Sequence, residues 1–67
     1  MSDMEPLLDE LAAARFLAVS AGTLRNWRSK NRGPEFIHIG ASVRYSPERL
    51  RRYVEARTRR VRDLPHG

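Results

Sequence analysis

Apolar residues near the start of the chain recur at helical spacing. Ala13, Ala14 and Leu17 fall on one narrow face of the segment 10–17, whose Ala-rich composition favours a helix. Asp9 directly precedes the segment and belongs to the residue types preferred as N-caps. The pattern therefore predicts a first helix over residues 10–17, and its small side chains allow another helix to approach closely.

A second helix is expected after a break at Ala18 and Val19. Ser20 can cap a helix that runs from about residue 21 to residue 30. Gly33-Pro34 follows, and this pair ends a helix because proline cannot continue it. The first two predicted helices are thus joined by a turn of about three residues.

The next segment changes period and residue type. Residues 36–39 and 43–45 are β-branched and aromatic, with Gly40-Ala41-Ser42 between them as a turn. This pattern predicts a hairpin of two very short strands. Such a hairpin is marginal alone, so it must pack on the helices.

A third helix is predicted by its start signal and its period. Ser46 is a good N-cap and Pro47 suits the first helical position. Leu50, Tyr53 and Val54 follow at helical spacing, so all three are expected to face the core.

The order of elements is helix, tight turn, helix, hairpin, helix. It predicts a mainly α fold with a small β-hairpin, a winged helix-turn-helix. The length of 67 residues favours one domain with a modest core. We expect that domain to span residues 7–57, with a flexible N-terminus at residues 1–6 and a basic, frayed tail at residues 58–67.

Charge is distributed unevenly along the chain. The first ten residues hold four acids and no base, whereas residues 11–67 hold 13 bases against four acids, and 12 of these bases are Arg. The Arg side chain fits phosphates and guanine edges, so the basic field predicts a polyanionic partner. A basic surface that only keeps the protein soluble is the alternative.

Other classes of function are not favoured by the composition. The chain has no Cys and two His, so neither a metal site nor a cofactor is expected. Catalysis is not expected either, because the Ser, His and Asp residues lie on segments that should not converge on a pocket. No apolar run is long enough to span a membrane, and the acidic start is unlike a signal peptide, so we expect a soluble intracellular protein.

The second predicted helix separates apolar from polar residues. With Leu24 and Trp27 placed inward, the opposite face carries polar or small residues. Arg can bind guanine, and Asn adenine, through two hydrogen bonds in the major groove. The residues expected on this outer face are Gly22, Arg25, Asn26 and Ser29.

Other residues of the same helix suit contacts with phosphate. Ser20 and Thr23 lie at its N-terminus, where free N–H groups and the helix dipole attract anions. Gly22 would let the backbone approach DNA closely. Arg28 and Lys30 are placed for phosphates, which position a protein without reading sequence.

Several of these residues also have a structural interpretation. Trp27 is expected to be a core anchor, although stacking on a base is the alternative. Arg25 and Asn26 could be ordinary solvated surface, and Ser20 could be only an N-cap. His38 is expected to be a surface residue of a strand rather than a metal ligand.

An ordered set of residues over about positions 7–57 resembles a known family. The chain is similar to the MerR-like winged helix-turn-helix proteins of the small excisionase and AlpA type. No single piece is specific, but the order of the set is. The matching residues are Leu7, Leu8, Asp9, Ala14, Val19, Ser20, Thr23, Leu24 and Trp27, then Gly33, Pro34, Phe36, Val43, Arg44, Tyr45 and Ser46.

The resemblance implies double-stranded DNA as the partner. It places Arg25, Asn26 and Arg28 at the DNA, and Arg44 on phosphate from the wing. It implies an excisionase that binds cooperatively, shapes attachment-site DNA and works with an integrase. The alternative is a small prophage-type transcriptional regulator, acting as a dimer or array. Either protein would be cytoplasmic and of bacterial or phage origin, with no small-molecule effector.

Among the departures of the chain from the family pattern, two concern the turn and the wing. Ala18 stands where Gly is usual, so the turn must avoid the left-handed conformation or accept strain. The wing tip carries Ala41-Ser42 in place of Arg or Lys, so weaker wing contacts are expected. A different class of function also stays open, in which the basic face docks on an acidic protein.

Overall fold

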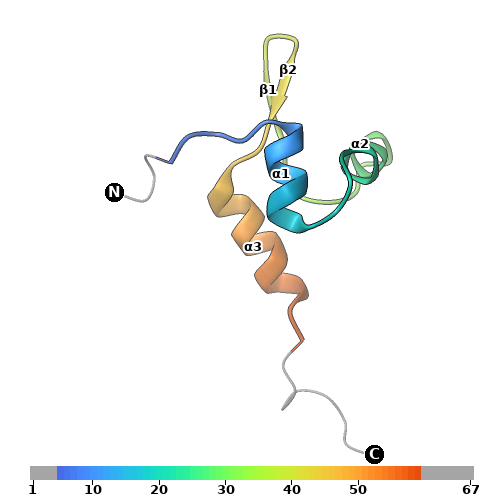
Figure 1. The fold of residues 1–67 in the computed structure, drawn as a ribbon, viewed down its shortest axis with the longest axis vertical. Helices are drawn as coiled ribbons and strands as arrows, with labels where there is room; N and C mark the ends of the chain where they lie inside the picture. The colour runs from blue at the N-terminus through green and yellow to red at the C-terminus, as the bar shows by residue number, and fades with distance from the viewer. Residues whose placement is uncertain (1–4, 60–67) are drawn as a thin grey trace, which may run out of the picture.

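The computed structural model describes residues 5–59 of the chain. Figure 1 shows the hairpin projecting from one end of the molecule, while α3 runs toward the other end. The observed order confirms the predicted winged helix-turn-helix. The elements are α1 (Glu10–Leu17), α2 (Ala21–Ser29), β1 (Ile37–Ile39), β2 (Ser42–Arg44) and α3 (Pro47–Arg57).

All three helices begin at the predicted caps. In each case a side-chain oxygen accepts a hydrogen bond from the backbone N–H three residues further on, which satisfies one free donor of the first turn. The distances are 2.8 Å for Asp9, 3.0 Å for Ser20 and 3.4 Å for Ser46. The bounds of α1 match the prediction, and α2 ends at Ser29, one residue earlier than expected.

The turn between α1 and α2 adopts the left-handed conformation in spite of its side chain. Ala18 has φ 58° and ψ 40°. Its N–H donates to the carbonyl of Arg15 at 3.1 Å, and the N–H of Val19 donates to the carbonyl of Ala14 at 3.0 Å. The turn therefore accepts the strain that a glycine would avoid.

The hairpin turn is one residue shorter than predicted. Ile39 pairs with Ser42, so Ser42 belongs to β2 and only Gly40 and Ala41 form the loop. Gly40 takes φ 60°, as the first loop residue of a type II′ hairpin turn does. Two-residue loops of this kind match the twist of the flanking strands.

The segment before α1 is tied to the hairpin. The N–H of Leu8 donates to the carbonyl of Tyr45 at 2.8 Å, and the N–H of Tyr45 donates back to the carbonyl of Leu8 at the same distance. This bridge holds the start of α1 beside the end of β2. The bridge adds a third segment of backbone to the very short hairpin.

The core is small and is built from residues of every helix. Alanine side chains on α1 let both α2 and α3 pack against that helix. The core cluster consists of Ala13, Ala14, Leu24, Tyr45 and Leu50. Tyr53 is half-buried, as expected of a core-facing residue, but Val54 is exposed over 43% of its surface. The prediction that Val54 faces the core was wrong, because α3 presents too narrow a face to the small core.

The predicted flexible ends lie mostly outside the described residues. Of the expected N-terminal segment, Glu5 is described and forms an ion pair with Arg51 of α3. Residues 60–67 of the expected basic tail are not described. Among the helices within residues 5–59, none has the length and apolar character needed to cross a membrane.

Candidate nucleic-acid interface

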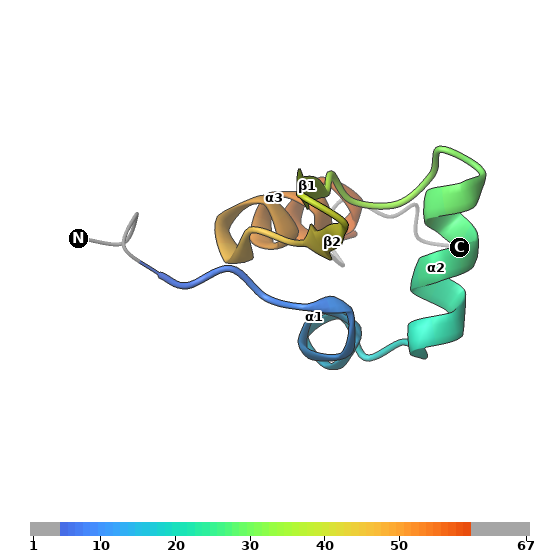
Figure 2. The same ribbon diagram turned by 90° about the horizontal axis from the view of Figure 1, so that it is seen from above.

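Helix α2 stands at the side of the molecule (Figure 2). Its apolar residues belong to the core cluster or pack against it. Leu24 is fully buried and Trp27 is half-buried against the core. The opposite face is open to solvent, as the three-residue spacing of Leu24 and Trp27 predicts. The exposed residues of that face are Gly22, Arg25, Asn26 and Ser29.

Trp27 sets the position of this helix through contacts on two sides. Its ring lies 6.3 Å from that of Tyr53 on α3, at a tilted angle of 47°. On the other side, Gly33 lies so close that a Cβ on it would stand 2.9 Å from Cε3 of the indole. Trp27 is therefore a packing residue that orients the outer face of α2.

The hydroxyl groups of α2 are engaged within the helix. Ser20 donates its hydroxyl hydrogen to Oγ1 of Thr23 at 2.9 Å while it accepts the Thr23 N–H. Ser29 donates to the backbone carbonyl of Asn26 at 2.9 Å. Ser20 therefore acts as the N-cap of α2 and satisfies one of the free N–H groups of its first turn.

Arg25 is paired with an acid from the start of α1. Its Nε and Nη2 atoms both donate to Oε2 of Glu10, at 3.2 and 2.9 Å. The Arg25 side chain is still 63% exposed, whereas that of Glu10 is 23% exposed. The guanidinium is thus oriented by α1 but remains accessible from the outer side of α2.

Arg28 is held more deeply than Arg25, the other basic residue of α2. Its Nη1 donates to Oε1 of Glu10 and to the hydroxyl of Tyr45, both at 3.0 Å. Its guanidinium carbon lies 5.8 Å from the centre of the Phe36 ring. With a side chain only 21% exposed, Arg28 braces α1, α2 and the hairpin, and this internal role was not predicted.

These contacts favour the charged form of both Glu10 and Arg28. The hydrogen bonds from Arg25, with those from Arg28, hold the pKa of Glu10 below its ordinary value, and partial burial opposes them. The hydrogen bond to the Tyr45 hydroxyl, with that to Glu10, raises the pKa of Arg28 further. Each group is kept in its charged form at neutral pH.

The remaining predicted contacts lie at the edges of this surface. Lys30 is exposed directly after α2, at its C-terminal end. Arg44 on β2 is half-buried, and its Nη1 donates to the backbone carbonyl of Val43 at 2.8 Å. A shallow depression of about 350 Å³ joins the start of α1 to the hairpin, lined by Asp9, Glu10, Leu11, Arg28, Ala41, Val43 and Arg44.

Sequence reasoning missed Glu10 and Tyr45 as partners of the basic residues. In the sequence, Glu10 is one of the four acids of the first ten residues, and Tyr45 belongs to the second predicted strand. One signal was available, because the first ten residues are acidic whereas α2 carries two arginines and no acid. The arginines that Glu10 meets depend on the angle at which α1 and α2 cross. Spacing along the chain does not show that angle.

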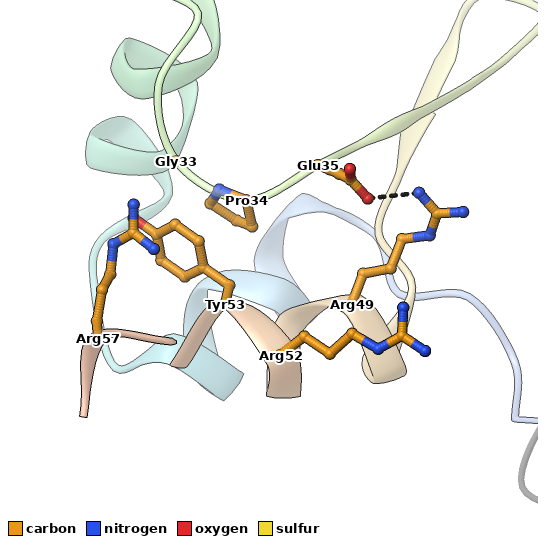
Figure 3. Close-up of a pocket in the computed structure, with 7 residues that line it drawn as sticks. All are labelled: Gly33, Pro34, Glu35, Arg49, Arg52, Tyr53 and Arg57. Atoms are coloured by element: carbon orange, nitrogen blue, oxygen red, sulfur yellow. Dashed lines mark hydrogen bonds and ion pairs between the residues drawn. The ribbon is translucent and has the colours of Figure 1, made fainter. Parts of the chain in front are cut away.

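A second basic surface lies on α3 and was not predicted (Figure 3). A depression of about 380 Å³ separates α3 from the loop 33–35. Pro34 and Tyr53 form its apolar part, and the guanidinium carbon of Arg57 lies 3.8 Å from the centre of the Tyr53 ring. Arg49 pairs with Glu35 at one end, and Arg52 extends beside it. Figure 2 shows the segment that contains this loop running from the end of α2 to the start of β1.

The sequence of this domain matches one known protein family. The helix-turn-helix domain family, which includes excisionase-like proteins, matches residues 12–58. Among curated proteins and among solved structures, no match was found. The matched span begins within α1 and ends just after α3, so it contains α2 and the hairpin. The chain therefore belongs to the helix-turn-helix domain family, whose fold implies DNA binding.

Proposed function

We propose that this protein binds double-stranded DNA at specific sequences through the outer face of α2. One observation carries the proposal. Leu24 and Trp27 anchor α2 on the core, and the anchored helix exposes Arg25 and Asn26 side by side. Arg25 provides the two donors that read guanine, and Asn26 provides the donor and acceptor that read adenine in the major groove.

Phosphate contacts would surround that reading face. The first turn of α2, capped by Ser20, offers backbone N–H groups for one phosphate, and Gly22 permits a close approach. Lys30 at the far end of α2 and Arg44 on the hairpin are the candidates for two others. Arg28 would act mainly as the brace between helices, with any phosphate contact made from its exposed part.

Within this proposal, an excisionase role is preferred to transcriptional regulation. The family includes excisionase-like proteins. One α2 reads only a few base pairs, so useful specificity needs several copies bound together. Cooperative binding to direct repeats, with bending of the DNA and recruitment of an integrase, would serve excision. A dimer on inverted repeats would instead serve a repressor.

The experiment selects target sites from a random duplex library with the purified protein and then footprints the selected sites. The affinity for both selected and random duplexes should fall steeply with salt, since phosphate contacts release counterions. Direct repeats that bend on binding, measured by circular permutation of the site, would support the excisionase role. Inverted repeats without bending would support the regulator. Failure to bind any duplex at low salt would refute DNA binding by this protein.

A second candidate function is docking on an acidic protein, and the α3 depression is the observation that favours it. Three arginines surround Tyr53 and Pro34 there, and no residue that lines the depression belongs to α2. An acidic peptide with one aromatic or aliphatic side chain fits that chemistry. The triple substitution of Arg49, Arg52 and Arg57 by Ala should abolish peptide binding and leave site preference on DNA unchanged. Unchanged binding of the acidic peptide by this variant would exclude the candidate.

A further inference from the structure

Glu10 joins the first helix to the reading face of the second. Its two carboxylate oxygens are divided between the arginines: Oε2 accepts both hydrogen bonds of Arg25, and Oε1 accepts that of Arg28. The Glu10 side chain is largely covered, at 23% exposed. It is therefore a fixed acceptor built into the α1–α2 crossing.

The way in which Arg25 uses its donors leaves one edge of the guanidinium available. The side edge, Nε with Nη2, faces Glu10. The end edge, formed by Nη1 and the second hydrogen of Nη2, donates to no other described residue, and the side chain is 63% exposed. That end edge has the forked geometry that matches O6 and N7 of guanine.

The contact also changes what Arg25 can bind. An unpaired arginine on a flexible stem attracts any phosphate, in any orientation. A carboxylate within 3.2 Å of its nitrogens weakens this general attraction and reduces the rotamer freedom that is lost when DNA binds. Weak attraction to the backbone and a fixed direction toward bases both favour discrimination between sequences.

We propose that Glu10 is a specificity-determining positioning residue, which aims the end edge of Arg25 at a guanine and suppresses its binding to phosphate. The inference rests on the proposed function and deepens it, because it names the base and the residue that directs its reading. Arg28 shares the same carboxylate and holds Glu10 in place from the other side.

The test compares Glu10→Gln with the wild type on the selected duplex and on a random duplex. Loss of the carboxylate charge should strengthen binding to the random duplex severalfold. It should weaken the preference for the selected over the random duplex, by roughly five- to tenfold. The loss of preference should fall on one guanine, measured with duplexes substituted at each position. These two effects run in opposite directions, which loss of folding would not produce.

Two further variants separate positioning from simple charge. Glu48→Gln removes the same charge from the exposed Glu48–Arg52 pair on α3, so it should leave the preference for the selected duplex unchanged. In an Arg25→Ala background, Glu10→Gln should no longer alter base preference, because it acts through Arg25. Circular dichroism and thermal melting of each variant would verify folding.

The outcomes distinguish this inference from the proposed function. If the wild type selects a sequence and Glu10→Gln keeps the full preference, the positioning role of Glu10 is refuted while DNA recognition stands. An equal gain on both duplexes, or a change of preference that persists without Arg25, also refutes it. A wild type that prefers no sequence refutes both.

Discussion

Gly33 lies against the indole of Trp27, so closely that no Cβ fits between them. A Cβ at residue 33 would stand 2.9 Å from Cε3 and 3.1 Å from Cβ of Trp27. The φ angle of Gly33 is 82°, in the region that other residues rarely adopt. Both features fix the path of the chain as it leaves α2, and with it the orientation of the helix that is proposed to read DNA.

Replacing Gly33 by Ala should therefore destabilise the fold. The new methyl group must push the indole aside, and the backbone must hold a strained angle, so we expect a loss of about 1–3 kcal/mol in the free energy of unfolding. Urea denaturation followed by Trp27 fluorescence measures it. A variant as stable as the wild type would mean that Trp27 and the turn can shift at little cost.

The opposite change at Ala18 should stabilise the protein. Ala18 holds φ 58° in the turn between α1 and α2, where glycine carries no steric cost. We expect Ala18→Gly to raise the free energy of unfolding by about 0.5–1 kcal/mol, after the greater entropy of glycine in the unfolded chain is subtracted. Thermal melting would show it as a rise of a few degrees. A fall in the melting temperature would show that the turn carries no such strain.

Replacing Gly22 by Ala should change the stability of the fold and the affinity for DNA in opposite directions. A Cβ there would meet only Oγ of Ser20, at an ordinary 3.8 Å, so Gly22→Ala fits the folded protein. It should stabilise α2 by about 0.5–1 kcal/mol because alanine favours helix. If the α2 backbone approaches DNA as proposed, the same variant should bind DNA more weakly. Melting curves and gel shifts on the selected duplex measure the two effects, and tighter binding by the stabilised variant would contradict the close approach.

Arg25 and Asn26 should differ from Lys30 in their effects on recognition. Arg25→Ala and Asn26→Ala should each relax the preference at one base pair, at a cost of about 1–3 kcal/mol on the selected site. Lys30→Ala should weaken binding to all sequences alike and lower the salt slope by about one. Titrations of selected and single-substituted duplexes at several salt concentrations test this. Uniform weakening by the first two variants would assign those residues to phosphate.

Acid should weaken the fold through Glu10. The hydrogen bonds from Arg25 and Arg28 lower the pKa of Glu10 in the folded state. The folded state therefore favours the ionised carboxylate. The stabilising contribution is complete above the pKa of an unfolded glutamate, about 4.3, and is lost as the pH falls through the lowered value. The stability advantage of the wild type over Glu10→Gln should hold at neutral pH and shrink below about pH 4. Urea titrations across that range measure this difference in the free energy of unfolding. A difference that does not change with pH would show that Arg25 and Arg28 do not stabilise the ionised form of Glu10.

Features that depend on neighbours in sequence were predictable. Asp9, Ser20 and Ser46 cap the three helices because an N-cap needs only a short polar side chain and a backbone N–H three residues away. The two faces of α2 follow from the spacing of Leu24 and Trp27 for the same reason, since helical geometry relates near residues. The element order, and with it the winged helix-turn-helix, came from such local signals.

Features that depend on how elements cross were decided by the tertiary structure. Glu10 meets Arg25 and Arg28 across 15 and 18 residues of chain. The angle between α1 and α2 sets which basic residues it reaches. The exposure of Val54 likewise reflects the small core against which α3 packs. The sequence by itself determined which residues α2 presents. Packing decided that the carboxylate of Glu10 orients Arg25 and that Arg28 is held between the elements. Such contacts follow from the angles at which helices cross rather than from local spacing.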